Sequence, residues 1–342
     1  MDKILLAHGS GGRLSHDLIR DLFLPHFSAP ALAKLDDSAV VGPIAAALTA
    51  GDSGRLAFTT DSYVVKPLFF KGGDIGRLAV CGTVNDLAMV GAEPLYLSAG
   101  FVIEEGLELA VLRRVIASMK ESAQEAGVEI VAGDTKVVER GAADELFINT
   151  AGLGAVAPGL DISASNARAG DVVILSGAIG DHGIAVLSQR EGLAFQTDLA
   201  SDVAPLNHLV AAMLKTSPHI HVLRDPTRGG LATSLNEIAS QSQIGIRIEE
   251  SQIPVHDGVR AACEMLGYDP LHVANEGKLV AIVPPEDAET VLLAMRSVPQ
   301  GREAAIIGEV IAEPRGRVLL RTGIGGTRIV DMLAGEMLPR IC

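Results

Sequence analysis

Acidic residues stand in four short motifs of a kind that can hold a metal ion beside a phosphate. The motifs are LDDSAV (35–40), TTDSY (59–63), VNDLA (84–88) and RDPTRGG (224–230). Asp86 interrupts a segment that is otherwise apolar, and a buried carboxylate without a partner is costly. A hard cation such as Mg²⁺ would be a suitable partner, because it binds carboxylates together with phosphates. Aspartates also favour helix caps and turns, so a purely structural role stays open for each of them.

Three further motifs place polar groups where a ligand could lie. The segment HGSGG (8–12) has glycines that would let backbone N–H groups approach an anion, although a simple turn explains it equally well. The segments GDTK (133–136) and NEGK (275–278) stand at the ends of predicted strands. The chain has no GxxxxGK[ST] motif, so any nucleotide must be bound by something other than a P-loop.

The three cysteines are Cys81, Cys263 and Cys342. Their odd number and wide spacing argue against a disulfide framework or a CxxC metal site. We expect Cys81 and Cys263 to be buried in helices, whereas Cys342 ends a segment, 336–342, that we interpret as a mobile tail with a reach of roughly 20 Å. The neighbouring α-carboxylate disfavours the thiolate of Cys342, which suits a thiol that another enzyme acylates. A terminal thiol without function is the alternative.

These motifs must be positioned by elements that alternate between strand and helix. Hydrophobic periodicity predicts a mixed α/β chain with a break near 157–165, and hence domains at 1–157 and 165–335 before the tail. The predicted strands are 55–65, 94–103, 128–132, 146–156, 171–176, 244–248, 279–283, 304–311 and 318–321. The predicted helices are 75–90, 107–126, 182–189, 205–215, 229–240, 258–266 and 286–295.

Composition excludes several classes of partner. The 342 residues are 48% hydrophobic and 20% charged, which is typical of a folded protein of about two domains. A formal net charge of -14 repels nucleic acid and anionic lipid, so we expect neither as a partner. No apolar run is long enough for a signal peptide or a membrane span, so we expect a cytoplasmic protein.

Together the motifs resemble one family along essentially the whole chain. HGSGG, LDDSAVV, TTDSYVV, TVNDLAMVGA, GDTKVVERG, RDPTRGGLATSLNEIA, ANEGK and the terminal PRIC are similar to the hydrogenase maturation factors of the HypE type. These are carbamoyl dehydratases in the superfamily of aminoimidazole ribonucleotide synthetase, selenophosphate synthetase and thiamine-monophosphate kinase. The PRIC terminus separates them from their relatives.

The resemblance implies a two-domain fold like that of aminoimidazole ribonucleotide synthetase, a homodimer, and ATP bound with Mg²⁺. It implies that Mg²⁺ is held by Asp37, Asp61, Asp86 and Asp225, with Asp36 as an alternative to Asp37. The residues that would contact the nucleotide are these four aspartates with Gly9, Ser10, Gly11, Gly12, Asp134 and Thr135.

The resemblance also implies a reaction. The partner HypF would place a carbamoyl group on Cys342 as a thiocarbamate, and ATP would phosphorylate its oxygen. Loss of phosphate and of the nitrogen protons would leave a thiocyanate. The cyano group would pass to iron on a HypC–HypD complex and become a ligand of [NiFe]-hydrogenase. Lys136 and Glu276 match positions that could handle the amide protons, and the lysine could instead stabilise the phosphoryl charge.

Two alternatives remain at the level of sequence. The same ATP site could serve a kinase or synthetase that acts on a small molecule, in which case loss of Cys342 would leave turnover intact. The chain could instead be a thiol carrier that binds a nucleotide without turning it over.

Overall fold

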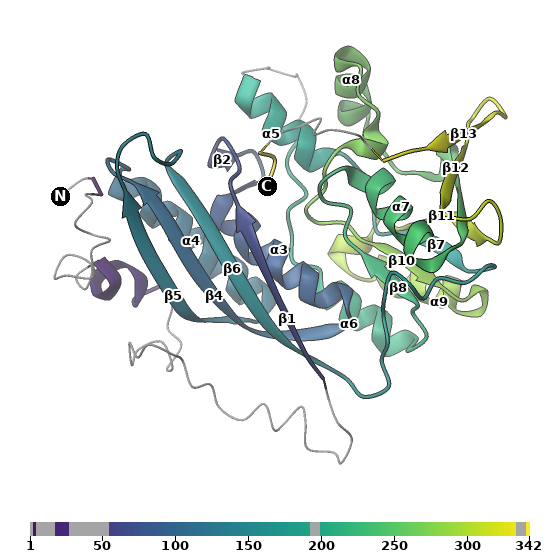
Figure 1. Cartoon of the computed structure of the whole chain (residues 1–342), viewed down its shortest axis with the longest axis horizontal. Helices are drawn as coiled ribbons and strands as arrows, with labels where there is room; N and C mark the ends of the chain where they lie inside the picture. Colours follow the sequence, from purple (N-terminus) through teal and green to yellow (C-terminus); the bar gives the residue numbers. More distant parts are fainter. Residues whose placement is uncertain (1–2, 5–17, 27–54, 192–198, 333–339) are drawn as a thin grey trace.

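Two β-sheets with helices packed between and around them form the protein (Figure 1). The computed structural model describes residues 3–4, 18–26, 55–191, 199–332 and 340–342. The first sheet has four strands in the order β1-β6-β4-β5, and only the β4–β5 pair is parallel. The second sheet has seven strands in the order β13-β12-β9-β11-β7-β10-β8, with only the β9–β12 pair parallel. A small third sheet pairs β2 with β3.

The strands of the first half are short to medium in length, except for β4. They are β1 Arg55–Tyr63, β2 Phe69–Phe70, β3 Gly73–Asp74, β4 Ala92–Glu104, β5 Glu129–Val138 and β6 Leu146–Val156. The second half contains β7 Val172–Leu175, β8 Val222–Arg224, β9 Gly245–Glu249, β10 Val280–Val283, β11 Ala305–Ile311, β12 Arg317–Arg321 and β13 Thr327–Val330.

The helices alternate with these strands. They are η2 Ile19–Phe23, α3 Ile75–Met89, α4 Leu109–Ala126, α5 Asp181–Glu191, α6 Asn207–Thr216, α7 Gly230–Ser242, η4 Glu250–Gln252, α8 Asp257–Leu266, η5 Pro270–His272, α9 Pro285–Arg296 and η6 Pro299–Gly301. The helix α4 ends where Gly127 takes a left-handed conformation with φ of 73°, which glycine adopts without strain.

The helix α3 is the central element of the molecule. It packs against β1, β4 and β6 on one side, and against α6 and β8 of the second half on another (Figure 1). Every residue of α3 is buried except Arg77 and Asp86. The Asp74 side chain caps its first turn by accepting hydrogen bonds from the N–H groups of Gly76 and Arg77. An apolar helix therefore positions the one acidic side chain that points out of it.

The observed elements confirm the mixed α/β prediction, and most lie within a few residues of the expected ranges. The strand β5 is longer than predicted, because its second half continues as the exposed edge of the sheet. The pairs β2–β3 and the strands β8 and β13 were not predicted, since two to four residues give too little alternation to detect. No helix within the described ranges is long and apolar enough to cross a membrane.

Candidate functional site

A cavity of about 710 Å³ opens between β1 and α3 on one side and the segment after β8 on the other. Residues 57–61 of β1 line it, and the side chains of this strand alternate between its two faces. Thr59 and Asp61 share one of these faces, and the Thr59 hydroxyl donates a 3.0 Å hydrogen bond to Asp86 on α3. Asp225 lies across the cavity, where β8 ends and the turn into α7 begins.

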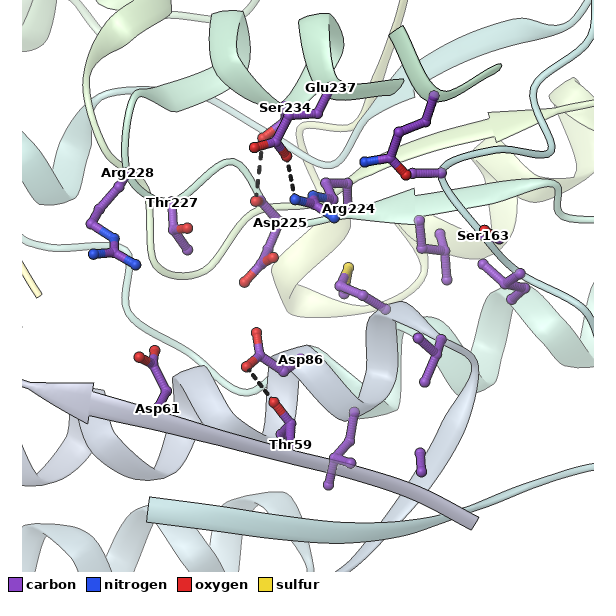
Figure 2. A pocket seen from close by; sticks show the side chains of 18 of the residues that line it. Thr59, Asp61, Asp86, Ser163, Arg224, Asp225, Thr227, Arg228, Ser234 and Glu237 are labelled. Carbon is purple, nitrogen blue, oxygen red and sulfur yellow. Dashed lines mark hydrogen bonds and ion pairs between the residues drawn. The ribbon is translucent and has the colours of Figure 1, made fainter. Parts of the chain in front are cut away.

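Three of the four aspartates that the sequence predicted as metal ligands thus meet in one cavity (Figure 2). Asp61 comes from a strand, Asp86 from a helix and Asp225 from a loop of the second half. Burial raises the pKa of Asp86 to about 6. The hydrogen bond from Thr59 opposes this increase, and the negative charge of Asp61 adds to it. Burial and the charge of Asp86 raise the pKa of Asp225 to about 7. The carboxylates repel one another, as expected of a site that has room for a cation.

The described part of the chain contains no group of three or more His, Cys, Asp or Glu side chains close enough to hold a metal ion unaided. Asp36, Asp37 and the glycine-rich segment Gly9, Ser10, Gly11 and Gly12 lie outside the described residues. The cavity also has cationic residues in its wall. Arg224 is ion-paired with Glu237, and Arg228 is exposed (Figure 2).

Glu276 forms a second, more deeply buried group beside this cavity. Glu276 is 3% exposed, and its Oε1 atom has no hydrogen-bond partner among the described residues. Burial, and then the charges of Asp225 and Asp202, raise the pKa of Glu276 well above its usual value. The backbone of Glu276 is fixed at both ends, because its N–H donates to Asp202 and its carbonyl accepts from Asn85 on α3.

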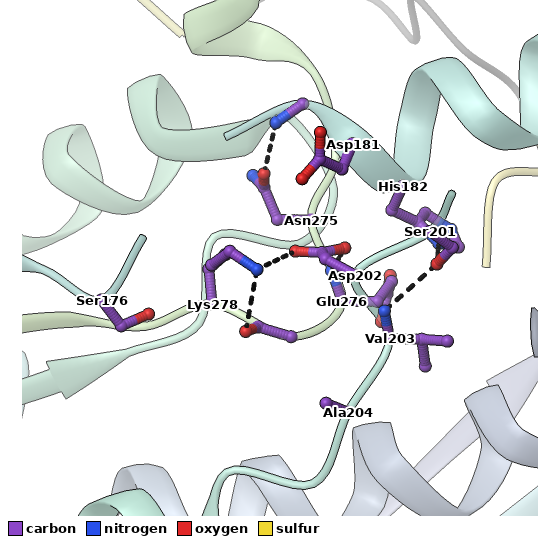
Figure 3. Close-up of polar contacts among 12 residues, drawn as sticks. Ser176, Asp181, His182, Ser201, Asp202, Val203, Ala204, Asn275, Glu276 and Lys278 are labelled. Carbon is purple, nitrogen blue, oxygen red and sulfur yellow. Dashed lines mark hydrogen bonds and ion pairs between the residues drawn. The ribbon is translucent and has the colours of Figure 1, made fainter. Parts of the chain in front are cut away.

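Asp202 is itself held by Lys278, whose Nζ lies 3.2 Å from Asp202 Oδ2 (Figure 3). The sequence motifs indicate Glu276 but not Asp202 and Asn85, which position it. Asn85 could have been found, since it precedes Asp86 in the same apolar helix. Asp202 stands in an irregular segment with no periodic pattern, so the sequence gives no comparable signal for it.

The end of the chain lies at the junction of the two halves. A main-chain oxygen of Cys342 accepts a 3.0 Å hydrogen bond from the N–H of Val64, one residue beyond the end of β1. Arg340 forms an ion pair with Asp144 and donates through Nε to the Val64 carbonyl. Cys342 is partly buried, whereas Cys81 and Cys263 are buried as predicted. Residues 336–339, which make up most of the predicted tail at 336–342, are outside the described ranges.

Asp134, Thr135 and Lys136 do not reach the cavity within one chain. They lie on β5, which is separated from β1 by β4 and β6. Lys136 pairs in register with Val102, and Val102 with Phe147, so three strand spacings, or about 14 Å, separate it from the β1 edge. Lys136 is exposed there and forms a 2.9 Å ion pair with Asp134.

Known proteins are similar to this chain over nearly its whole length. Models of the N-terminal and C-terminal domains of AIR synthase related proteins match residues 35–156 and 168–321. A protein of Bradyrhizobium diazoefficiens, described as carbamoyl dehydratase HypE, is 57% identical over 98% of this chain and 95% of its own length.

Solved structures agree with this similarity. A crystal structure of the hydrogenase maturation protein HypE in complex with ATP has a TM-score of 0.93 and 53% identity, with 99% of each chain covered. A chain in the crystal structure of a HypE–HypF complex has a TM-score of 0.79 and 49% identity, and the match covers 92% of this chain and 99% of that one.

Proposed function

The chain belongs to the HypE family of carbamoyl dehydratases, and from this premise we propose that its substrate is a carbamoyl group carried on its own Cys342. ATP-dependent dehydration would convert this thiocarbamate into a thiocyanate, the source of cyanide ligands for the iron of [NiFe]-hydrogenase. One observation supports the proposal above all. The chain end is bound at Val64, on the extension of the strand whose Thr59 and Asp61 line the acidic cavity.

The acidic cavity is the proposed site of ATP and Mg²⁺. Mg²⁺ is usually bound by one or two carboxylates together with substrate phosphates, so the three spaced aspartates fit it only when a nucleotide completes the ligand set. Asp61, Asp86 and Asp225 would hold the ion, with Asp37 as the fourth predicted ligand. A bound Mg²⁺ would neutralise charge on the phosphates during phosphoryl transfer. Gly9, Ser10, Gly11 and Gly12 remain the predicted contacts of the phosphates.

The proposed chemistry balances as thiocarbamate plus ATP giving thiocyanate, ADP and phosphate. The carbamoyl oxygen attacks the γ-phosphorus, and ADP leaves. The carbon–oxygen bond then breaks with loss of phosphate, while the nitrogen gives up both of its protons and the carbon–nitrogen triple bond forms. A group that accepts such a proton must lie within about 2.6–3.2 Å of it, directly or through one water.

Glu276 is the described residue best suited to accept a proton. Its buried Oε1 has no partner, and its raised pKa makes the carboxylate a stronger base than an exposed glutamate. Lys136 stays a predicted participant, and since β5 lies three strands from β1, it could serve the cavity only of a second copy of the chain.

A homodimer through the four-stranded sheet would bring two copies together in this way. The helices α3 and α4 cover one face of this sheet. The other face exposes Phe58 by 71%, Leu56 by 49% and Val102 by 37%, and an apolar surface of this kind is typical of a protein interface. We therefore propose residues 1–157 as the nucleotide-binding and dimerisation domain and residues 165–335 as the second domain.

The proposed partners follow from the chemistry of the tail. A crystal structure pairs a HypE relative with HypF, which supports HypF as the donor of the carbamoyl group to Cys342. An iron-carrying HypC–HypD complex is the proposed acceptor of the cyano group.

The experiment that tests the function follows the intact mass of the carbamoylated protein after Mg-ATP is added. We expect the Cys342 adduct to lose the mass of one water, with one phosphate released per event. Glu276→Gln keeps the shape of the side chain but removes the base, so its adduct should stay unchanged while ATP still binds. An unchanged wild-type adduct would contradict the dehydratase and favour a carrier. ATP turnover by Cys342→Ala on a small molecule would favour a kinase.

A further inference from the structure

A buried histidine contacts the C-terminal segment from the second half of the molecule. His182, in the first turn of α5, is 0% exposed. Its Nε2 atom lies 2.8 Å from the carbonyl oxygen of Ile341, and its Nδ1 atom lies 2.8 Å from the Ser201 hydroxyl. The ring also packs edge-on against Phe70, with 5.4 Å between ring centroids. Neither the acidic cavity nor Glu276 accounts for this histidine.

The neighbours of His182 select one tautomer. A carbonyl oxygen can only accept a hydrogen bond, so Nε2 must carry the proton that it donates to Ile341. Nδ1 then accepts from the Ser201 hydroxyl, whose oxygen accepts in turn from the N–H of Val203 (Figure 3). Burial lowers the pKa of His182, which favours this neutral form.

Main-chain oxygen atoms of the last three residues accept further hydrogen bonds. The Arg340 carbonyl accepts from Arg190 Nη2 at 2.7 Å and from the N–H of Lys66 at 3.4 Å. A main-chain oxygen of Cys342 accepts from the N–H of Val64. Each of the three final residues therefore accepts a hydrogen bond through a main-chain oxygen, and these bonds involve no atom of the cysteine side chain.

We propose that His182 is a positioning residue that holds the C-terminal segment docked through the Ile341 carbonyl, whatever group the sulfur of Cys342 carries. Ile341 is only 2% exposed, so in the docked state its carbonyl cannot replace the hydrogen bond from His182 by one from bulk water. A buried carbonyl without a donor is unfavourable, so removal of the donor should favour the undocked state of the segment. The role of this docking in the reaction rests on the proposed function, whereas the docking itself does not.

The rate at which Cys342 reacts with iodoacetamide tests the docking in the full chain without ATP or a partner. Cys81 and Cys263 are buried, so intact mass follows the first alkylation. His182→Leu fills the space but removes the donor, and we expect alkylation about 2–10-fold faster, as loss of one hydrogen bond predicts. His182→Gln keeps a donor at the end of its side chain and should fall between wild type and His182→Leu.

His208→Leu is the matched control. His208 Nε2 also contacts a backbone carbonyl, that of Glu125 at 2.9 Å, but this contact joins α6 to the end of α4, away from the chain end. The control should alkylate at the wild-type rate. Equal rates for His182→Leu and wild type, or an equal increase in His208→Leu, would overturn the proposal. The comparison of His182→Gln with wild type keeps the test valid should His182→Leu not fold.

A second measurement tests the role in the reaction. In a single turnover of the carbamoylated protein, His182→Leu should dehydrate more slowly by about the same factor, with unchanged affinity for ATP. Faster alkylation with an unchanged dehydration rate would overturn His182 as a positioning residue for the chemistry. Absence of dehydration in the wild type would instead contradict the proposed function, and the alkylation result would stand apart from it.

Discussion

At the scale of residues, the acidic cavity is lined by carboxyl groups whose negative charges repel one another. The pKa of Asp225 is raised to about 7 by burial first and then by Asp86. A carboxyl group whose pKa is raised on folding binds protons more tightly in the native state than in the unfolded one. Its contribution to stability is therefore lost as pH rises from the unfolded value near 4 through the folded value near 7.

This sign gives a prediction for Asp225→Asn in protein freed of metal and nucleotide. The amide cannot ionise, so at about pH 8 the variant should unfold at a higher urea concentration than wild type, and the difference should shrink toward about pH 5. Asp134→Asn is the control. Its Lys136 partner lowers the pKa of Asp134, so the effect of that substitution should not change over this pH range. A difference for Asp225→Asn that does not depend on pH would contradict the assignment.

At the scale of elements, α3 joins the two halves as well as supporting the cavity. Asn85 donates from Nδ2 to the carbonyls of Ala204 and Glu276, and its Oδ1 accepts from the N–H of Leu206. These bonds fix the segment after residue 199 and the loop that carries Glu276 to the same turn of helix. The neighbouring Asp86 points into the cavity from that turn. Of these two adjacent residues, Asn85 therefore connects the two halves and Asp86 belongs to the site.

Asn85→Ala should therefore destabilise the protein and displace Glu276 together. The side chain is 1% exposed, and the groups left without partners should each cost about 1–3 kcal/mol of unfolding free energy, measured by urea denaturation. Ser122→Ala is the control, because the buried Ser122 hydroxyl donates to the Ser118 carbonyl, one turn earlier in the same helix α4. Equal losses for the two variants would show that Asn85 has no special role between the halves.

The sequence predicted the elements better than their assembly. The motifs around Asp61, Asp86 and Asp225 are local, and the strand and helix that hold the first two follow from periodicity. The approach of Asp225 to Asp86 depends on how the halves pack, which no local pattern encodes. The contact of His182 with Ile341 joins residues 159 positions apart, and the distance of Lys136 from the cavity of the same chain depends on the order of strands in the sheet.

At the scale of the whole molecule, the open face of the four-stranded sheet sets the expected assembly. Phe58, on the edge strand β1, is 71% exposed. A charge there would be unfavourable in an apolar interface, so Phe58→Glu should shift the protein toward monomer in sedimentation equilibrium. Met265 on α8 is 77% exposed in the other half, and Met265→Glu should leave the mass unchanged. A dimer that survives Phe58→Glu would place the interface elsewhere.

The docking of the chain end through its carbonyl groups sets up a competition between two steps of the cycle. In the proposed cycle, a docked segment is not accessible to the partner that would carbamoylate Cys342, so the apparent affinity of that partner is reduced to the extent that the segment is docked. Looser variants such as His182→Leu should thus be loaded more readily but converted more slowly. Throughput is then greatest when the docked segment is bound with intermediate strength, as a small number of hydrogen bonds to main-chain oxygens would give.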